Sequence, residues 1–319
     1  MNEPQKVKVG VVGVGKLGQY HARLYSESEK AELIGIYDVN QAITAEVAKT
    51  LSTLSFDSLE KLIKSVDCLS VAVPTHLHFE VVSELLQKKK HVLVEKPITA
   101  KIADGKKLVA LAQQHKVVLQ VGHVERYNPV IDYLENKINN PKFIEAHRLA
   151  FYPPLRPAMP PRGTEVSVVL DLMIHDIDVI LNLVKSPVSR IDAVGIPILS
   201  KSADIANTRL TFANGCVANL TASRVSQETM RKIRVFQPDA YLSFNYQDRK
   251  GEIVTKTGMS IKREAVPIED QNALKLELED FLHCSKEALV QGTVPQPKVS
   301  AEHGLQALEI AVQIEQQFT

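Results

Sequence analysis

The chain has 319 residues, and its 38 Lys and Arg against 37 Asp and Glu leave a net charge of +1. This length predicts two domains, because a domain usually takes roughly 100–200 residues. The balanced charge excludes a global electrostatic attraction to nucleic acid or acidic membrane, and 45% hydrophobic residues with 24% charged residues exclude a largely disordered chain.

Strand and helix patterns alternate over the first 120 residues. Short apolar segments predict strands at Val7–Val12, Glu32–Asp38, Cys68–Val73, His91–Val94 and Val117–Val121. Helical patterns between them cover Leu17–Ser26, Gln41–Leu51, Ser58–Ser65, His76–Lys89 and Ile102–His115. This alternation predicts βαβ units around a parallel sheet that is covered on both faces.

The pattern changes after about Gly122. Residues 142–151 predict a strand and Val166–Val184 a helix, and further strands follow at Val188–Gly195, Ala206–Phe212, Cys216–Ser223, Lys232–Phe236, Ala240–Asn245 and Glu252–Thr257. Asn214-Gly215 is typical of a hairpin turn. Helices at about Ala273–Gln291 and Ser300–Phe318 end the chain. A run of strands without crossover helices predicts an α+β domain with a large, mainly antiparallel open sheet.

A glycine motif follows the first strand and opens the first helix. Gly13, Gly15 and Gly18 form Gly-x-Gly-x-x-Gly, in which the glycines allow a tight turn, close approach of a pyrophosphate, and helix packing on the strand. The helix N-terminus favours the anionic pyrophosphate. We therefore predict a Rossmann domain over residues 1–122, with Lys16 and Leu17 beside the glycines in the cofactor site, and a substrate-binding and oligomerisation domain over residues 123–319.

Asp38 ends the second predicted strand, 20 residues after Gly18. A carboxylate at this position accepts hydrogen bonds from the ribose hydroxyls of NAD and disfavours the 2′-phosphate of NADP. The following residues, Val39 and Asn40, supply no arginine for such a phosphate. NAD is the predicted cofactor, while an N-cap role for Asp38 in the next helix is the alternative.

Two further motifs carry chemistry. Lys96, in Glu95-Lys96-Pro97, follows a predicted strand at the sheet edge where ligands bind, and its ammonium can stabilise negative charge on a substrate oxygen. Asp171, His175 and Asp178 are spaced to share one helix face, where a histidine beside a carboxylate can exchange a proton. A surface lysine and satisfied buried polar groups are the alternatives, and we expect no metal site.

Together, the glycine motif, Glu95-Lys96-Pro97 and Asp171-x-x-x-His175 resemble the Gfo/Idh/MocA oxidoreductases over essentially the whole chain. The resemblance implies an NAD(P)-dependent dehydrogenase acting on a CH–OH group of a sugar, cyclitol or sugar derivative. It implies catalytic roles for Lys96, Asp171 and His175. One departure concerns the segment before Asp171, where many relatives have Gly-Gly and this chain has Arg162-Gly163-Thr164.

The resemblance also extends to cofactor and substrate contacts. It implies cofactor contacts for Pro74, Thr75, His78, Glu95, Lys96 and Arg126, although Thr75 can also be a simple helix cap. Substrate contacts are implied for Lys96, His123, Tyr127, Asn128, Asp171 and His175, although residues 123–129 can equally serve as a linker. Arg156 and Arg162 lie in a proline-rich segment, where arginine suits a substrate phosphate but can also be solvated.

The segments 123–129 and 171–178 look most like those of bacterial members that act on nucleotide sugars. This implies a substrate such as UDP-N-acetylglucosamine, oxidised at its 3-hydroxyl, with a free sugar or cyclitol as the alternative. A different class, a non-catalytic NAD(H)-binding scaffold that responds to redox state, also stays open.

The sequence contains weaker indications of the protein's binding partners and of its cellular compartment. We expect no nucleic-acid or membrane partner, and a homodimer or homotetramer formed through the second domain's sheet. Three widely spaced cysteines form no disulfide framework, and the N-terminal residues show no signal-peptide pattern. Both observations favour a cytoplasmic location.

Overall fold

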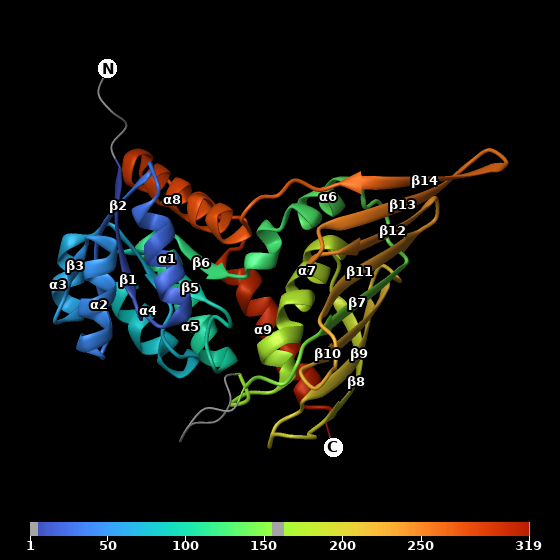
Figure 1. Ribbon diagram of the computed structural model, residues 1–319, viewed down its shortest axis with the longest axis horizontal. Helices are drawn as coiled ribbons and strands as arrows, with labels where there is room; N and C mark the ends of the chain where they lie inside the picture. The colour runs from blue at the N-terminus through green and yellow to red at the C-terminus, as the bar shows by residue number, and fades with distance from the viewer. Residues whose placement is uncertain (1–5, 155–162, 319) are drawn as a thin grey trace. The chain divides into compact units, whose positions relative to one another are not determined.

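The computed structural model describes residues 6–154 and 163–318. The chain divides into two compact units, which are coloured by residue number in Figure 1. The first unit comprises the described part of Met1–Val124 together with Asn272–Leu305. The second comprises the described parts of Glu125–Gln271 and Gln306–Thr319.

A six-stranded parallel sheet forms the centre of the first unit. Its strand order is β3-β2-β1-β4-β5-β6. The strands are β1 (Val7–Val12), β2 (Ala31–Tyr37), β3 (Leu54–Ser55), β4 (Cys68–Val71), β5 (His91–Glu95) and β6 (Leu119–Gly122). This order confirms the predicted Rossmann fold. Strand β3 was not predicted, because two residues carry no recognisable pattern.

Helices connect these strands. They are α1 (Lys16–Ser26), α2 (Gln41–Leu51), α3 (Leu59–Ser65), the 3₁₀ turn η1 (Thr75–Leu77), α4 (His78–Gln87) and α5 (Ile102–His115). Side chains of α1 and α2 are buried against strand residues such as Val9 and Val11. Helix α4 packs beside α5.

Helix α8 (Ala273–Gln291) also belongs to the first unit. Its Leu278, Phe281 and Leu282 are buried in the same core as Val9 and Tyr25. The predicted second domain, residues 123–319, included this helix. Sequence order suggested that grouping, whereas the apolar face of α8 is buried against strands that lie more than 180 residues earlier in the chain.

An eight-stranded sheet forms the second unit, in the order β14-β13-β12-β11-β7-β10-β9-β8. The strands are β7 (Phe143–Leu149), β8 (Val188–Ile196), β9 (Ile205–Phe212), β10 (Val217–Ser223), β11 (Met230–Gln237), β12 (Ala240–Asn245), β13 (Lys250–Thr257) and β14 (Ser260–Pro267). Neighbours are antiparallel except for β7 and β10, which confirms the predicted mainly antiparallel sheet. Asn214-Gly215 forms the predicted turn, with a φ of +82° at Gly215.

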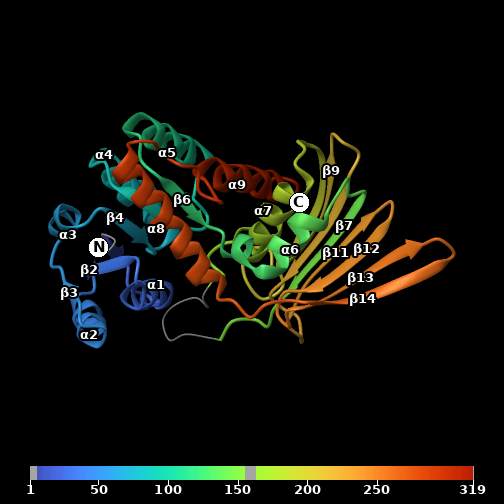
Figure 2. The same ribbon diagram turned by 90° about the horizontal axis from the view of Figure 1, so that it is seen from above.

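Helices lie on one face of this sheet (Figure 2). They are the turn η2 (Val124–Tyr127), α6 (Pro129–Lys137), the π-helical turn η3 (Val169–Met173), α7 (Ile174–Val184) and the end of α9 (Ala301–Glu315). Strand residues alternate between buried and half-exposed, as in β10, because one face is packed and the other is open. Within residues 6–154 and 163–318, no helix is long and apolar enough to cross a membrane.

Candidate functional site

The turn between β1 and α1 is shaped by glycines. Gly13 has a φ of +87°, and a Cβ there would lie 2.8 Å from the backbone of Ala72. Gly18 packs directly against the carbonyl group of Gly13. A Cβ on Gly15, by contrast, would point into open space, and Gly15, the residue before α1, has no side chain that could accept a hydrogen bond from the first N–H groups of the helix. The N–H groups at this helix end are therefore open to an anionic group such as a pyrophosphate.

Lys16 and Leu17 are exposed on the first turn of α1, next to this open position. Asp38 lies just after β2 and binds the same turn: its Oδ2 accepts a hydrogen bond of 2.8 Å from the Val14 N–H. Its Oδ1 accepts one of 2.9 Å from the Asn40 N–H. The alternative that Asp38 caps α2 is wrong, because the Asn40 side chain is the cap.

The segment after β4 contains three predicted cofactor contacts, which differ in how far they are buried. Pro74 is exposed and Thr75 is half-buried in η1. His78 is buried, and its ring nitrogens lie 2.9 Å from the Pro97 carbonyl oxygen and 3.0 Å from that of Val73. Burial lowers the pKa of His78, although both carbonyls act in the opposite direction. The ring of His78 thus joins two turns of the first unit, so a cofactor contact for it stays a prediction.

Glu95 and Lys96 lie at the end of β5, and both are half-buried. The Lys96-Pro97 peptide bond is cis. Glu95 accepts a hydrogen bond at 3.0 Å from His21, a fully buried residue of α1 that sequence analysis missed. The spacing could have indicated this residue, because His21 follows Gly18 by three residues and therefore lies on the same face of α1, the face that packs on the sheet.

Asp171 and His175 lie on consecutive turns of the second unit, and both are half-buried. Asp171 belongs to the π-helical turn η3, and His175 to the first turn of α7. Gly163, with a φ of +84°, packs against the Asp171 carboxylate, which leaves no room for a Cβ there. A glycine of this chain thus lies against Asp171, although the Gly-Gly pair of many relatives is absent.

Asp178 follows His175 by three residues in α7, so these two side chains lie on the same side of the helix. The Asp178 side chain is buried and accepts a hydrogen bond from Arg126 at 3.3 Å. Burial raises the pKa of Asp178 to about 7, although the charge of Arg126 acts against this shift. The prediction of a face shared with Asp171 assumed one regular α-helix, whereas the wider turn η3 changes the angular relation between Asp171 and the residues of α7.

The predicted link residues are mostly buried. Arg126 is in contact with Glu135 at 3.8 Å as well as with Asp178. His123 and Tyr127 are buried, and the Asn128 side chain caps α6 by accepting from the Val130 N–H at 3.1 Å. These residues thus have structural roles, and their predicted cofactor or substrate contacts stay predictions. Arg156 and Arg162 lie outside the described residues.

Two buried arginines were also missed. Arg148 donates two hydrogen bonds to Asp176, at 2.8 and 2.9 Å, and one to Glu125 at 2.9 Å. The charges of these carboxylates raise the pKa of the Arg148 guanidinium, although burial acts in the opposite direction. Glu125 is also buried, but its pKa lies below the usual range, because the charges of Arg148 and Arg231 outweigh the effect of burial.

Arg224 supports the segment that contacts Asp171. Its Nη1 donates to the Gly163 and Val166 carbonyls at 2.7 and 2.9 Å, and its Nε donates to Asp204 at 2.9 Å. No local sequence pattern distinguishes a buried polar residue at a strand end. Only the tertiary structure therefore reveals the hydrogen bonds of Arg224.

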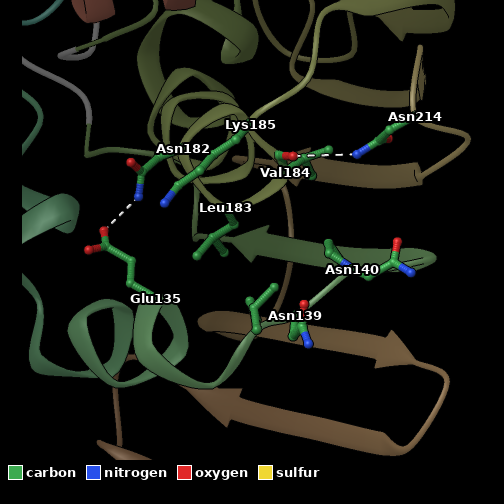
Figure 3. A pocket seen from close by; sticks show the side chains of 10 residues that line it. Glu135, Asn139, Asn140, Asn182, Leu183, Val184, Lys185 and Asn214 are labelled. Carbon is green, nitrogen blue, oxygen red and sulfur yellow. Dashed lines mark hydrogen bonds between the residues drawn. The ribbon is translucent and has the colours of Figure 1, made fainter.

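A pocket in the second unit lies at the other end of α7 from His175 (Figure 3). Its side chains come from the ends of α6 and α7 and from the β9–β10 turn, including Glu135, Asn139, Asn182, Lys185 and Asn214. Asn182 donates to Glu135 at 2.6 Å. His175 is in the first turn of α7 and this pocket is at the last. No group of described side chains forms a metal site.

Comparison with protein families assigns both parts of the chain. Residues 7–123 match the model described as "Oxidoreductase family, NAD-binding Rossmann fold". Residues 134–242 match the model described as "GFO/IDH/MocA C-terminal domain". The two matches together cover more than half of the chain.

Individual relatives agree with this assignment. UDP-N-acetylglucosamine 3-dehydrogenase of Acidithiobacillus ferrooxidans is 37% identical over 284 residues, which are 87% of this chain and 88% of the relative. A solved structure of that enzyme superposes with a TM-score of 0.90 and covers 99% of this chain and 98% of its own. Myo-inositol 2-dehydrogenase of Thermotoga maritima is 25% identical over 68% of this chain and 69% of its own.

Proposed function

Since this chain belongs to the Gfo/Idh/MocA family of NAD-binding oxidoreductases, we propose that it oxidises a secondary alcohol of a nucleotide sugar. The proposed substrate is UDP-N-acetylglucosamine and the proposed position is its 3-hydroxyl. The observation that carries this proposal is the 37% identity, over 87% of the chain, with an enzyme named for that reaction.

The glycine turn suits the cofactor of the family. Open space at Gly15 and the uncapped N-terminus of α1 fit a pyrophosphate, and bound NAD supplies a hydride acceptor at its nicotinamide. Asp38 still has acceptor capacity for ribose hydroxyls beyond its two backbone hydrogen bonds. Because a second negative charge is disfavoured beside Asp38, we propose that NAD is preferred over NADP.

The proposed chemistry uses three side chains. Lys96 donates a hydrogen bond to the substrate oxygen and stabilises its developing negative charge. His175 accepts the proton of the hydroxyl group as the hydride leaves the same carbon. Asp171 orients these groups. Gly163 restricts the Asp171 carboxylate from one side, which supports such an orienting role.

A free sugar or cyclitol is the second candidate substrate, favoured by the similarity to myo-inositol 2-dehydrogenase. The deciding experiment follows absorbance at the nicotinamide wavelength with UDP-N-acetylglucosamine, glucose and myo-inositol, each with NAD and NADP. We expect NADH formation with the nucleotide sugar alone, and a loss of about 10²–10⁴ in kcat in Lys96→Met and His175→Asn.

Each alternative has its own result in this screen. Turnover of inositol or glucose, but not of the nucleotide sugar, would replace the proposed substrate. Tight NAD binding with no turnover of any substrate would favour the non-catalytic scaffold. Full activity in Lys96→Met would remove the proposed chemistry.

We also propose a cytoplasmic homo-oligomer. Cys68, Cys216 and Cys284 are free and buried, and burial raises the pKa of each thiol, which suits a reducing compartment. The open face of the eight-stranded sheet carries the neighbouring aromatic side chains of Phe143, Phe236 and Tyr241, which supports association through the second unit.

A further inference from the structure

A buried hydrogen bond connects the helix of the glycine turn with the strand that immediately precedes Lys96. His21 lies in α1, three residues after Gly18, and its Nε2 is 3.0 Å from Oε1 of Glu95 at the end of β5. His21 is completely buried, and the Glu95 side chain is 12% exposed. Solvent therefore competes little for this contact, in contrast to ion pairs on the surface.

The other oxygen of Glu95 is directed to the residue that follows it. Oε2 accepts a hydrogen bond of 3.3 Å from the Lys96 N–H. Burial alone would raise the pKa of Glu95, but the hydrogen bond and charge of His21, together with the charge of Lys96, hold it below the usual range. Glu95 is thus a carboxylate that only accepts, so Nε2 of His21 carries the hydrogen atom.

The neighbouring strand has a glycine beside the Glu95 carboxylate, which therefore occupies space that a side chain at this position would need. Gly122 pairs with Glu95 in the parallel ladder between β5 and β6. A Cβ at Gly122 would lie 3.2 Å from Oε2 of Glu95, closer than ordinary packing allows. The two hydrogen bonds, from His21 and from the Lys96 N–H, thus restrain the carboxylate, and Gly122 leaves it the room to take this position.

We propose that His21 is a positioning residue, which holds Glu95 so that the backbone at Lys96 has one orientation relative to the helix of the glycine turn. The proposal rests on the proposed role of Lys96 in hydride transfer. Any movement of the Glu95 carboxylate would release the Lys96 N–H. The Lys96 side chain would then extend from a backbone without a defined orientation. Misplacement of a catalytic group by about 1 Å can cost roughly 10²-fold in rate.

The test compares substitutions that differ in one hydrogen-bond donor. His21→Ala removes the donor, and His21→Gln restores one at nearly the same place, because the Gln Nε2 and the His Nε2 lie equally far along the side chain. Using UDP-N-acetylglucosamine, we expect His21→Ala to lower kcat about ten- to a hundred-fold, with the KM for NAD changed less than about three-fold. We expect His21→Gln to recover most of the rate.

A second measurement needs no turnover. Hydrogen–deuterium exchange of the segment 93–99, with NAD bound, reports on the Lys96 N–H. We expect exchange there to be at least about ten-fold faster in His21→Ala than in the wild type, because the Lys96 N–H would no longer have a carboxylate held in place to accept its hydrogen bond. His21→Gln should restore slow exchange.

The control is His91→Gln, which removes a buried imidazole at the other end of β5, where Nδ1 accepts from the Val118 N–H at 3.0 Å. It should alter neither kcat nor exchange at 93–99.

Three results would overturn the proposal. In the first, His21→Ala keeps both kcat and exchange at wild-type values. In the second, it changes only the KM for NAD, and in the third, His21→Gln restores neither kcat nor slow exchange. Lys96→Met separates the two hypotheses: if it is fully active, the proposed function fails, whereas loss of activity there with normal exchange in His21→Ala overturns this inference alone.

Discussion

At the scale of single residues, Asp38 has a structural role in the glycine turn and a proposed role in the choice of cofactor, and experiment can separate the two. Its carboxylate accepts from the N–H groups of Val14 and Asn40, and the same charge disfavours a phosphate on the cofactor ribose. Local sequence was sufficient to identify it, because a strand end 20 residues after Gly18 is defined by spacing alone.

We predict that Asp38→Ser lowers the ratio of kcat/KM for NAD to that for NADP by about ten- to a hundred-fold. The reason is that hydrogen bonds to a charged group contribute about 1.5–3 kcal/mol. Initial rates with both cofactors measure this ratio. Asn40→Ala, which alters only the cap of α2, should leave the ratio unchanged, and an unaltered ratio in Asp38→Ser would contradict the assignment.

At the scale of elements, a buried ionic cluster joins η2 to β7 and α7. Glu125, in η2, accepts from Arg148 in β7 at 2.9 Å, and Arg148 also binds Asp176 in α7. Breaking one partner of such a cluster leaves an uncompensated buried charge, which is costly. The cluster therefore holds η2 to the sheet, independently of any catalytic role.

We predict that Glu125→Gln lowers the free energy of unfolding by about 3–5 kcal/mol at pH 7. The lowered pKa of Glu125 means that its stabilising effect is present above the ordinary glutamate pKa, about 4.3, and is lost as pH falls through the folded value. The difference between variant and wild type should therefore shrink below about pH 4.

Chemical denaturation at pH 7 and at pH 3.5 to 4.5 measures this effect, provided that the wild type is still folded at the lowest pH used. The matched control is Glu145→Gln, because the Glu145–Arg234 pair is 28% and 33% exposed and should contribute at most about 1 kcal/mol. A difference that stays constant with pH would contradict the ionic role of Glu125.

At the scale of the whole molecule, the open face of the eight-stranded sheet is the proposed surface for association. Phe143, Phe236 and Tyr241 lie on neighbouring strands, with ring centroids 5.5 and 5.0 Å apart. Their neighbours along the strands, such as Ile144 and Val235, are buried on the helix-covered face. The aromatic side chains therefore point to the open face, where they are half-buried.

We predict a dimer or tetramer in light scattering and its dissociation by Phe236→Glu, because a carboxylate would lose its solvation in an apolar contact. The control is Met259→Glu in the β13–β14 turn, an equally drastic change at a fully exposed side chain, which should keep the oligomer. A wild-type monomer, or an oligomer unaffected by Phe236→Glu, would exclude this surface.

Local sequence patterns were sufficient to predict the parallel sheet, the mainly antiparallel sheet, the glycine turn and the place of Asp38 at the end of a strand. Each depends on residues close in the chain or on a repeated pattern of burial, so periodicity and spacing were sufficient. Tertiary structure alone decided that α8 packs with the first unit, that His21 binds Glu95, that Asp178 is paired with Arg126, and that η3 widens the turn at Asp171. The first three features depend on contacts between segments distant in sequence, and a π-helical turn has no recognisable sequence pattern, so local periodicity predicts none of them.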